Sequence, residues 1–497
     1  MRKRVVIIGS GLGGLSCGLI LQRNGYDVTL LEQGSQIGGC LQCFTRRGAR
    51  FETGMHFIGS ASPGQTLHRL MNYLGLSDVA LSQLDTEAYD IVSLAGERFK
   101  FANGREAFID GMSRYFPHEK DNIARYYDVV GSVAAASSLH SLRHAESDAA
   151  INTRYQTESI NAVLDGIFTD ETLKNVLVGN LPLYSAERDR TPFSQHAFIM
   201  DFYNQSAYRI VGGSDRIAAK LADNIRALGG KVRANSKVTK IVCDDTHATG
   251  VEVNGDQFIP ADLVIAAIHP KRVMEMLDTR LIRPAFRQRM MNLKNTAAGF
   301  SVYLKFKPGR VPYMNSNFYS YASDTPWGCE QYSESTWPKG YLYMHFCSQP
   351  GATHADSGVI ISYMNMEDLS RWEGTRIGRR GEDYEEFKRR KAESLMQSVE
   401  KDFPGLRDSV ESYFTSTPLT YLDYTGTEGG SMYGVAKDIT LGAACRVPHK
   451  TRIPNLLLSG QNINSHGMLG VLVGSIVTCS ELLTAERIYQ QIIEANR

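Results

Sequence analysis

The chain has 497 residues, of which 42% are hydrophobic and 22% are charged. This length predicts two or more structural units, and the composition excludes a disordered chain or a small module held together by disulfides. Lys and Arg number 54 and Asp and Glu number 53, so the formal net charge is +1 and no nucleic-acid partner is expected.

The first elements of the chain predict a βαβ unit. Residues 4–9 form an apolar, β-branched run that is typical of a buried strand. A helical pattern follows from about residue 14 to residue 24, and a second strand around residues 28–31 ends at Glu32. This order of elements is typical of an α/β nucleotide-binding domain.

A glycine motif lies between the first strand and the helix. Residues 9–14 read Gly-Ser-Gly-Leu-Gly-Gly, which fits the pattern G-x-G-x-x-G. Gly9 allows a tight turn, Gly11 allows a pyrophosphate to approach the backbone, and Gly14 allows close packing of helix and strand. Phosphates are expected at the helix N-terminus, and Glu32 is placed to accept hydrogen bonds from a ribose. The motif therefore predicts a dinucleotide site.

The residues after the second strand favour FAD as the dinucleotide. An acid at position 32 followed by Gln33 argues against a 2′-phosphate, which leaves FAD or NAD. The chain then continues to a second glycine pair, Gly38 and Gly39, before Cys40. This pair allows the backbone to reach the same pyrophosphate from another side, and simple nicotinamide-dependent dehydrogenases do not usually carry it.

The rest of the chain alternates between two kinds of sequence pattern, which predicts two discontinuous domains. Strand and helix patterns of the nucleotide-binding style return after residue 205 and again near residue 455, and His269-Pro270 is expected to be a turn. Mixed strands, long helices and aromatic-rich segments fill the regions between. We expect an FAD-binding domain from residues 1–80, 205–275 and 430–497, and a substrate domain from residues 81–204 and 276–429.

Several segments together resemble the phytoene desaturase-type FAD oxidoreductase superfamily. They are the glycine motifs, residues 51–59 (FETGMHFIG), residues 208–214, the strand near Val238, residues 261–265, residues 453–461 and residues 467–470. Within this superfamily they are most similar to retinol saturases and carotenoid cis–trans isomerases. The resemblance implies a Rossmann-like FAD domain of the glutathione reductase type with a second, mixed α+β substrate domain.

The resemblance also implies which residues form the site. His56 and His466 are candidate catalytic residues, with a buried, hydrogen-bonded histidine that only shapes the cavity as the alternative for each, and no metal ligands are expected. The expected FAD contacts are Gly9, Gly11, Leu12, Gly13, Gly14, Glu32, Gln33, Gly38, Gly39, Cys40, His56, Val238, Gly460, Gln461, Met468 and Leu469.

Two of these positions depart from the pattern of many relatives. Cys40 stands where many desaturases have Arg, so backbone N–H groups and the helix dipole must do more to neutralise phosphate charge. Gln461 stands where many flavoproteins have Asp on the ribityl chain, and an amide can still donate and accept there. Cys40 and Cys43 form a single C-x-x-C pair, which is weak support for zinc.

The resemblance implies chemistry on the C=C bonds of an apolar polyene: a carotenoid, a retinoid or a long polyenoyl chain. We favour a saturase that exchanges a hydride at flavin N5, with transient NAD(P)H or a separate reductase as the electron donor. A carotenoid desaturase and an isomerase that uses reduced FAD are alternatives. A non-catalytic flavin- or lipid-binding carrier is an alternative of another class.

Cysteines and apolar runs predict the location of the protein. Eight cysteines lack the spacing of a disulfide framework, so reduced thiols in the cytoplasm are expected. The basic N-terminus precedes an apolar run too short for a signal peptide, and no eighteen apolar residues occur together. A transmembrane helix is not expected, while peripheral membrane contact through helices between residues 108 and 178 stays open.

Overall fold

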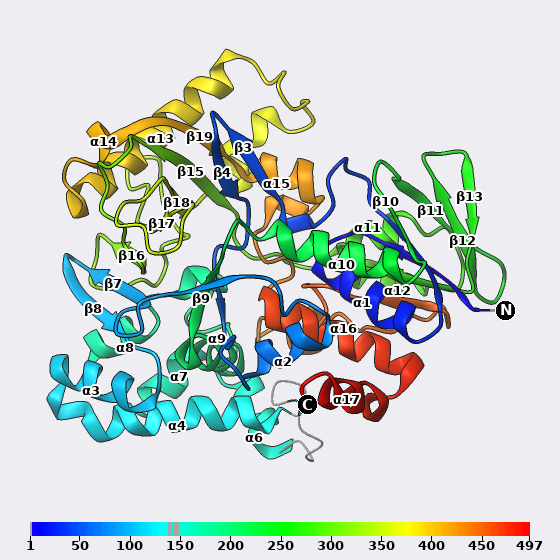
Figure 1. The fold of residues 1–497 in the computed structure, drawn as a ribbon, viewed down its shortest axis with the longest axis horizontal. Coiled ribbons are helices and arrows are strands. Elements are labelled where there is room, and N and C mark those ends of the chain that lie inside the picture. The colour runs from blue at the N-terminus through cyan, green and yellow to red at the C-terminus, as the bar shows by residue number, and fades with distance from the viewer. Residues whose placement is uncertain (1, 138–141, 143–148) are drawn as a thin grey trace.

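A computed structural model describes residues 2–137, 142 and 149–497, and the elements below belong to these residues. A five-stranded parallel sheet has the order β10-β2-β1-β14-β20. Its strands are β10 (Lys231–Arg233), β2 (Asp27–Leu31), β1 (Arg4–Ile8), β14 (Leu263–Ala266) and β20 (Leu456–Leu458). Three distant parts of the chain therefore meet in one sheet (Figure 1).

Both faces of this sheet are buried, which explains why β1 is apolar throughout. Val5 and Ile7 join the core under the helices α1 (Leu12–Arg23), α10 (Asp215–Ala227) and α16 (Gly467–Leu483). Val6 and Ile8 face the opposite way, toward an antiparallel sheet of β11 (Val238–Cys243), β12 (Ala248–Val253) and β13 (Gln257–Pro260). Alternate residues of a strand point to opposite faces, so a strand covered on both sides needs an unbroken apolar run.

A second, seven-stranded sheet has the order β19-β15-β18-β17-β16-β7-β8 and is antiparallel except where β16 pairs with β7. Its strands are β19 (Val410–Ser416), β15 (Gly299–Phe306), β18 (Ser357–Tyr363), β17 (Gly340–Phe346), β16 (Asn317–Tyr321), β7 (Asp90–Leu94) and β8 (Glu97–Phe101). One face packs with helices that include α3 (Arg105–Tyr115), α4 (Lys120–Ala136) and α9 (Phe193–Gln205), and the other packs on α13 (Glu382–Asp402).

Smaller elements complete the fold. The strands are the hairpin β3 (Cys43–Arg46) and β4 (Ala49–Glu52), and the small sheet of β5 (Ile58–Gly59), β9 (Ala207–Ile210) and β6 (Leu81–Gln83). The helices are α2 (Thr66–Tyr73), α6 (Ala149–Thr157), α7 (Ile160–Asp165), α8 (Glu171–Leu177), α11 (Pro270–Glu275), α12 (Pro284–Met291), α14 (Leu406–Ser409), α15 (Pro418–Thr425) and α17 (Ala485–Glu494).

The predicted fold class, α/β with a second mixed domain, is confirmed by this architecture. Strands from residues 1–80, 205–275 and 430–497 form the parallel sheet, and strands from residues 81–204 and 276–429 form the seven-stranded sheet. The domain boundaries themselves stay a prediction. His269-Pro270 is not a simple turn, because His269 caps the N-terminus of α11 by accepting a hydrogen bond from the Lys271 N–H group.

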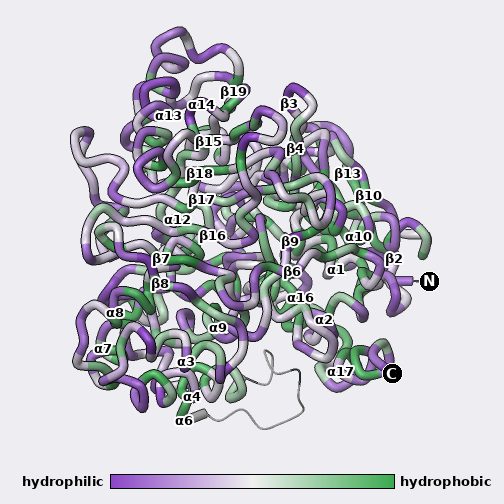
Figure 2. The backbone as a smooth tube through the Cα atoms, turned by 60° about the vertical axis from the view of Figure 1, so that its left-hand side comes forward, coloured by the Kyte–Doolittle hydropathy of each residue, from purple (hydrophilic) through white to green (hydrophobic). Residues whose placement is uncertain are grey.

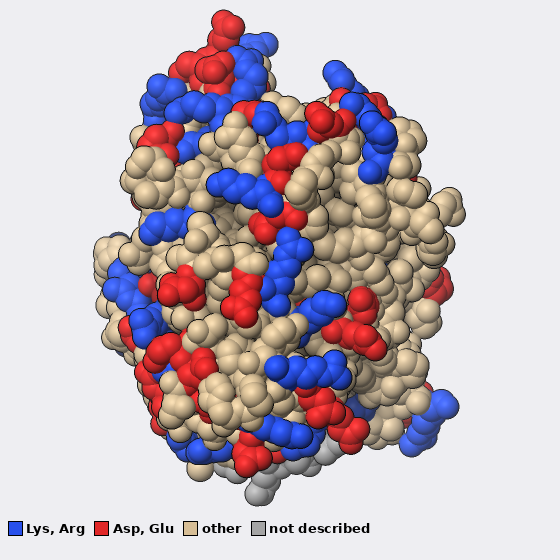
Figure 3. Space-filling model, turned by 90° about the vertical axis from the view of Figure 1, so that its left-hand side faces the viewer, with Lys and Arg blue, Asp and Glu red and all other residues tan. Residues whose placement is uncertain are grey.

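The surface reflects the balanced composition. Hydrophilic residues colour much of α13 (Figure 2), and the residues that this helix buries are mainly apolar. Positive and negative side chains are interspersed over the face drawn in Figure 3. Among the described residues no single helix has the length and apolarity to cross a membrane; α16 and α17 pass that test only as a pair, bent by 120°.

Candidate functional site

A cavity of about 840 Å³ reaches from the carboxyl end of the parallel sheet to the seven-stranded sheet. One half is lined by the turn after β1, the end of β2 and the segments around residues 236–239 and 459–471. The other half is lined by side chains of β16, β17 and β18 and of residues 421–433. We call these the dinucleotide half and the chamber.

The turn after β1 depends on two glycines. Gly9 has φ +96°, and a Cβ atom there would lie 2.8 Å from the Ile268 side chain. A Cβ atom on Gly14 would lie 2.0 Å from the Gly9 carbonyl oxygen. No larger residue fits either position without moving backbone, so the predicted tight turn and close helix packing are present.

The N-terminus of α1 opens onto the cavity. Gly11 is its N-cap in an extended conformation, and no side chain caps the helix. A Cβ atom on Gly11 would meet nothing within 4 Å, and Gly11, Leu12 and Gly13 line the cavity, so the first turn of the helix borders open space. Unpaired N–H groups at the positive end of a helix dipole bind anions, and this cradle fits a pyrophosphate.

The carboxylate of Glu32 is held at the cavity wall by three hydrogen bonds. Its Oε2 accepts from the Ser10 backbone N–H at 3.0 Å and from the Ser10 hydroxyl at 2.6 Å. Its Oε1 accepts from the Gly34 N–H at 2.8 Å. Oε1 has a further lone pair, so the fixed carboxylate fits a ribose hydroxyl. Ser10, whose hydroxyl also accepts from the Gly38 N–H at 3.1 Å, was not predicted, although it lies inside the glycine motif.

Nearly all of the predicted FAD contacts lie in the cavity wall. Those that line it are Gly9, Gly11, Leu12, Gly13, Glu32, Gln33, Gly38, Gly39, Cys40, His56, Val238, Gly460, Gln461 and Met468. Gly14 and Leu469 lie outside the lining: Gly14 packs beneath the turn, and Leu469 belongs to the core under α1 and α16. Their role as cofactor contacts stays a prediction.

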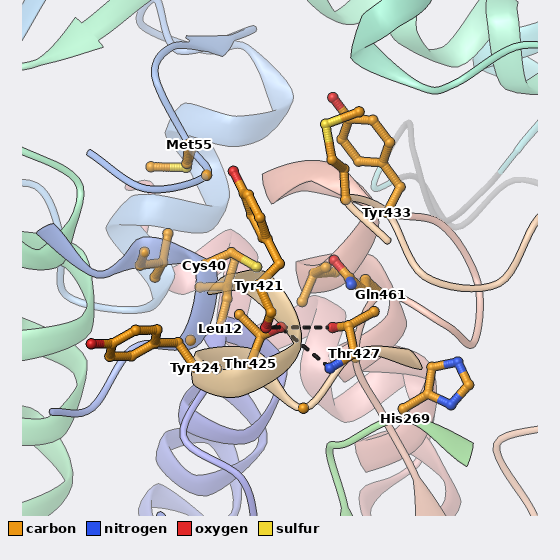
Figure 4. A pocket seen from close by; sticks show the side chains of 18 of the residues that line it. Leu12, Cys40, Met55, His269, Tyr421, Tyr424, Thr425, Thr427, Tyr433 and Gln461 are labelled. Atoms are coloured by element: carbon orange, nitrogen blue, oxygen red, sulfur yellow. Dashed lines mark hydrogen bonds between the residues drawn. The ribbon is translucent and has the colours of Figure 1, made fainter. Parts of the chain in front are cut away.

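The chamber is walled by aromatic side chains that the sequence did not single out. Tyr321, Tyr421 and Tyr433 turn their hydroxyl groups into the wall, where they donate to the carbonyl oxygens of Gly179 at 2.6 Å, Thr53 at 2.7 Å and Pro182 at 2.7 Å. Figure 4 shows Tyr421 between Cys40 and Tyr433. The cavity therefore meets mainly ring faces and aliphatic side chains, including Leu342 and Ile361.

The two candidate histidines have different positions. His56 lines the cavity, and its Nδ1 lies 3.6 Å from Oε2 of Glu52. His466 precedes α16 and lies behind Tyr433, with ring centroids 4.6 Å apart, outside the cavity lining. Burial, with a smaller contribution from the charge of Lys437, lowers the pKa of His466 to about 4, so this ring is neutral at pH 7. Whether either histidine is catalytic stays a prediction.

Lys437 is partly buried beside the loop that follows β20. Its Nζ donates to the carbonyl oxygens of Asn462 and Ile463, each at 3.4 Å. Burial lowers the pKa of Lys437 to about 8. No motif marks this lysine, because its neighbours come together only when the chain folds. No group of three or more His, Cys, Asp or Glu side chains in the described part of the chain is arranged to hold a metal ion.

Comparison with known proteins identifies the family. Residues 12–474 match the family described as flavin containing amine oxidoreductase. The all-trans-retinol 13,14-reductase of Rattus norvegicus is 28% identical over 537 residues, which cover 98% of this chain and 86% of the relative. The chloroplastic prolycopene isomerase 1 of an Oncidium hybrid cultivar is 22% identical, covering 97% of this chain and 84% of the relative.

The fold is shared with solved structures. The crystal structure of an oxidoreductase from Methanosarcina mazei superposes with a TM-score of 0.63 at 17% identity, covering 96% of this chain and 100% of that chain. The protein belongs to the flavin containing amine oxidoreductase family, and it is an FAD-dependent oxidoreductase. The predicted resemblance to the phytoene desaturase-type superfamily is confirmed. The cradle at Gly11 and the carboxylate of Glu32 fit this cofactor.

Proposed function

We propose that the protein is a saturase that reduces a C=C bond of a conjugated polyene. The observation that carries this proposal is the continuity of the cavity: the dinucleotide half passes directly into a chamber walled by rings and aliphatic side chains. Such a wall suits a long apolar chain, which loses contact with water on entry. Two relatives, a retinol reductase and a prolycopene isomerase, support a polyene substrate.

Different residues of the chain would bind the cofactor, position the polyene and donate a proton. FAD, once reduced, supplies a hydride from N5. The first turn of α1 and Glu32 would hold the dinucleotide, while Tyr421 and Tyr433 would press the polyene flat and exclude water. His56, which lines the cavity, would provide the proton that completes the reduction.

The electrons must come from outside the chain. We propose that NAD(P)H docks transiently or that a separate reductase supplies them, since the sequence has one G-x-G-x-x-G motif between a strand and a helix. An apolar substrate also favours loading from a bilayer, and we propose peripheral membrane contact by the helices between residues 108 and 178. Residues 138–141 and 143–148 of that segment lie outside the described residues.

Anaerobic single turnover tests this function. Enzyme reduced with dithionite is mixed with all-trans-retinol or lycopene, and the products are analysed by mass spectrometry while the flavin spectrum is followed. A saturase yields a product two hydrogens heavier and one oxidised flavin for each product. A product of unchanged mass, with the flavin still reduced, would instead support the isomerase, which the Oncidium relative makes the second candidate. Binding without any turnover would indicate a carrier.

A further inference from the structure

Reduction of a C=C bond needs a proton as well as a hydride, and most chamber groups are poor sources of it. Burial raises the pKa of the hydroxyls of Tyr203, Tyr363 and Tyr433. Burial also raises the pKa of the Cys40 thiol to about 11. These groups hold their protons at neutral pH, and the Tyr433 hydroxyl already donates to a backbone carbonyl.

His56 differs from them because a buried carboxylate faces its ring. The side chains of His56 and Glu52 are 7% and 8% exposed, and Nδ1 lies 3.6 Å from Oε2. This distance is that of an ion pair and slightly longer than a hydrogen bond, and Nδ1 has no hydrogen-bond partner among the described residues. Since Nδ1 faces Glu52, Nε2 on the far side of the ring is the nitrogen left for the cavity that His56 lines.

The charge on Glu52 is itself supported by the fold. Its Oε1 accepts a hydrogen bond from the Ser214 N–H at 2.9 Å, and Ser214 is the N-cap of α10. The positive end of a helix dipole and a backbone N–H both interact favourably with a nearby negative charge. Glu52 lies at the end of β4, so the hairpin and α10 together fix its position relative to the ring.

Other charged groups around the pair are few. Nη1 of Arg209 donates to the His56 carbonyl oxygen at 3.3 Å, which places a positive charge on the side of the backbone. Burial, with smaller contributions from the charges of Glu52 and Asp215, raises the pKa of the Cys43 thiol to about 11, and Asp215 is paired with Arg50. The carboxylate of Glu52 is therefore the negative charge that faces the imidazole ring.

We propose that Glu52 is a positioning residue that pairs with Nδ1 of His56 and directs Nε2–H of the reacting imidazolium form into the chamber. The inference rests on the proposed saturase activity. One carbon of the C=C bond accepts the hydride from the reduced flavin, and the electron pair of the π bond moves onto the conjugated chain. The Nε2–H bond breaks, its proton forms the C–H bond at the second carbon, and the flavin is left oxidised. The neutral ring keeps its proton on Nδ1 beside Glu52 and regains one at Nε2 from water when the product leaves.

Glu52→Gln is the central variant, because its amide oxygen can still accept from the Ser214 N–H while the negative charge is lost. His56→Gln removes the proton donor. Glu119→Gln is the matched control: Glu119 is a carboxylate 1% exposed that also accepts backbone N–H bonds, from Thr169 and Asp170, but lies outside the cavity lining. Glu52→Asp keeps the charge and tests for rescue, also in the case that Glu52→Gln folds poorly.

The experiment measures oxidation of dithionite-reduced, FAD-loaded enzyme by all-trans-retinol or lycopene in anaerobic stopped flow between pH 5.5 and 9. We expect His56→Gln to lower the rate about a hundredfold or more at all pH values. We expect the rate of Glu52→Gln to fall off at lower pH than that of the wild type, because the variant lacks the negative charge that faces the ring. Glu52→Asp should restore the midpoint, and Glu119→Gln should follow the wild type in FAD content and rate.

A Glu52→Gln profile that superimposes on that of the wild type, with product two hydrogens heavier in both, would overturn this inference and leave the saturase intact. The same holds if His56→Gln reacts at the wild-type rate. A wild type that forms no such product from either polyene would overturn the proposed function, and the inference with it. In D₂O, wild type that acts as proposed places one solvent deuteron in each product molecule.

Discussion

The two halves of the cavity are built in different ways. The dinucleotide half uses backbone: the N–H groups at the start of α1, the turn at Gly9 and a carboxylate held by Ser10 and Gly34. The chamber uses side chains from strands and loops far apart in the chain, such as Ile361 and Tyr433. Backbone sites tolerate almost no change in shape, whereas a side-chain wall can be remodelled without loss of the cofactor. Changes in the two halves should therefore have separable effects.

The largest effect is expected from Gly14→Ala. The new methyl group would lie 2.0 Å from the Gly9 carbonyl oxygen, so α1 cannot pack against the turn and its N–H groups move away from the pyrophosphate. We expect loss of bound FAD, measured by flavin absorbance and by fluorescence titration, with affinity reduced about a hundredfold or more.

The control is Gly131→Ala in the helix α4, where a Cβ atom would meet nothing within 4 Å. This variant should keep FAD and gain about 0.4–1 kcal/mol in the free energy of unfolding, because alanine restricts the unfolded chain. If Gly14→Ala bound FAD as tightly as Gly131→Ala and the wild type, the backbone at the start of α1 would not be the part that binds the pyrophosphate.

A pH effect on stability is expected from Asp90, on β7 of the seven-stranded sheet. Burial raises the pKa of this fully buried carboxyl to about 7 from its ordinary value of 3.8. The folded state therefore keeps a proton that the unfolded state loses, and the free energy of unfolding falls as the pH rises from about 4 to about 7. In Asp90→Asn the free energy of unfolding should fall by a few kcal/mol less over this pH range than in the wild type.

Urea denaturation at pH 5 and pH 8 measures the difference, with Asp110→Asn, whose side chain is 65% exposed, as the control that follows the wild type. A smaller decline in Asp90→Asn than in the wild type would show that the buried carboxyl of Asp90 makes the stability of the protein depend on pH. An equal decline in wild type and Asp90→Asn would show that Asp90 is ionised in the folded protein.

A smaller effect is expected from filling the chamber. Ile361→Trp adds volume to a side chain that lines the cavity from β18, so it should weaken polyene binding about tenfold or more. FAD content should stay at the wild-type level, because Ile361 lies on the other sheet. Ile361→Val, which makes no new contact, serves as the control. Loss of FAD in the tryptophan variant would mean that the two halves are not independent.

The smallest effect is expected from Tyr433→Phe. The change removes the hydroxyl that donates to the Pro182 carbonyl at 2.7 Å but keeps the ring at the chamber wall. One hydrogen bond is worth about 1 kcal/mol, so the free energy of unfolding should fall by about that amount, with FAD affinity unchanged. Tyr115→Phe, at a side chain 39% exposed, is the control. Urea denaturation measures the free energy of unfolding, and fluorescence titration with FAD measures the affinity for the cofactor.

The sequence by itself determined the fold class and most of the dinucleotide half. Gly9, Gly11, Gly14 and Glu32 lie within one βαβ unit, so their spacing along the chain sets their spacing in the structure. The apolar run of β1 likewise predicts a strand buried on both faces, because the periodicity of a strand is local. The turn glycines and the acid could be found because the backbone geometry that they require is short-range.

Only the tertiary structure decided the chamber. Tyr421 turns its hydroxyl to Thr53, and Tyr433 turns its hydroxyl to Pro182, across separations of 368 and 251 residues. The support of Glu52 by Ser214 spans 162 residues, and the burial that holds His466 neutral comes from the folded core around it. Burial and electrostatic neighbourhood are properties of packing, and a pattern of residue types cannot specify which distant groups will pack together.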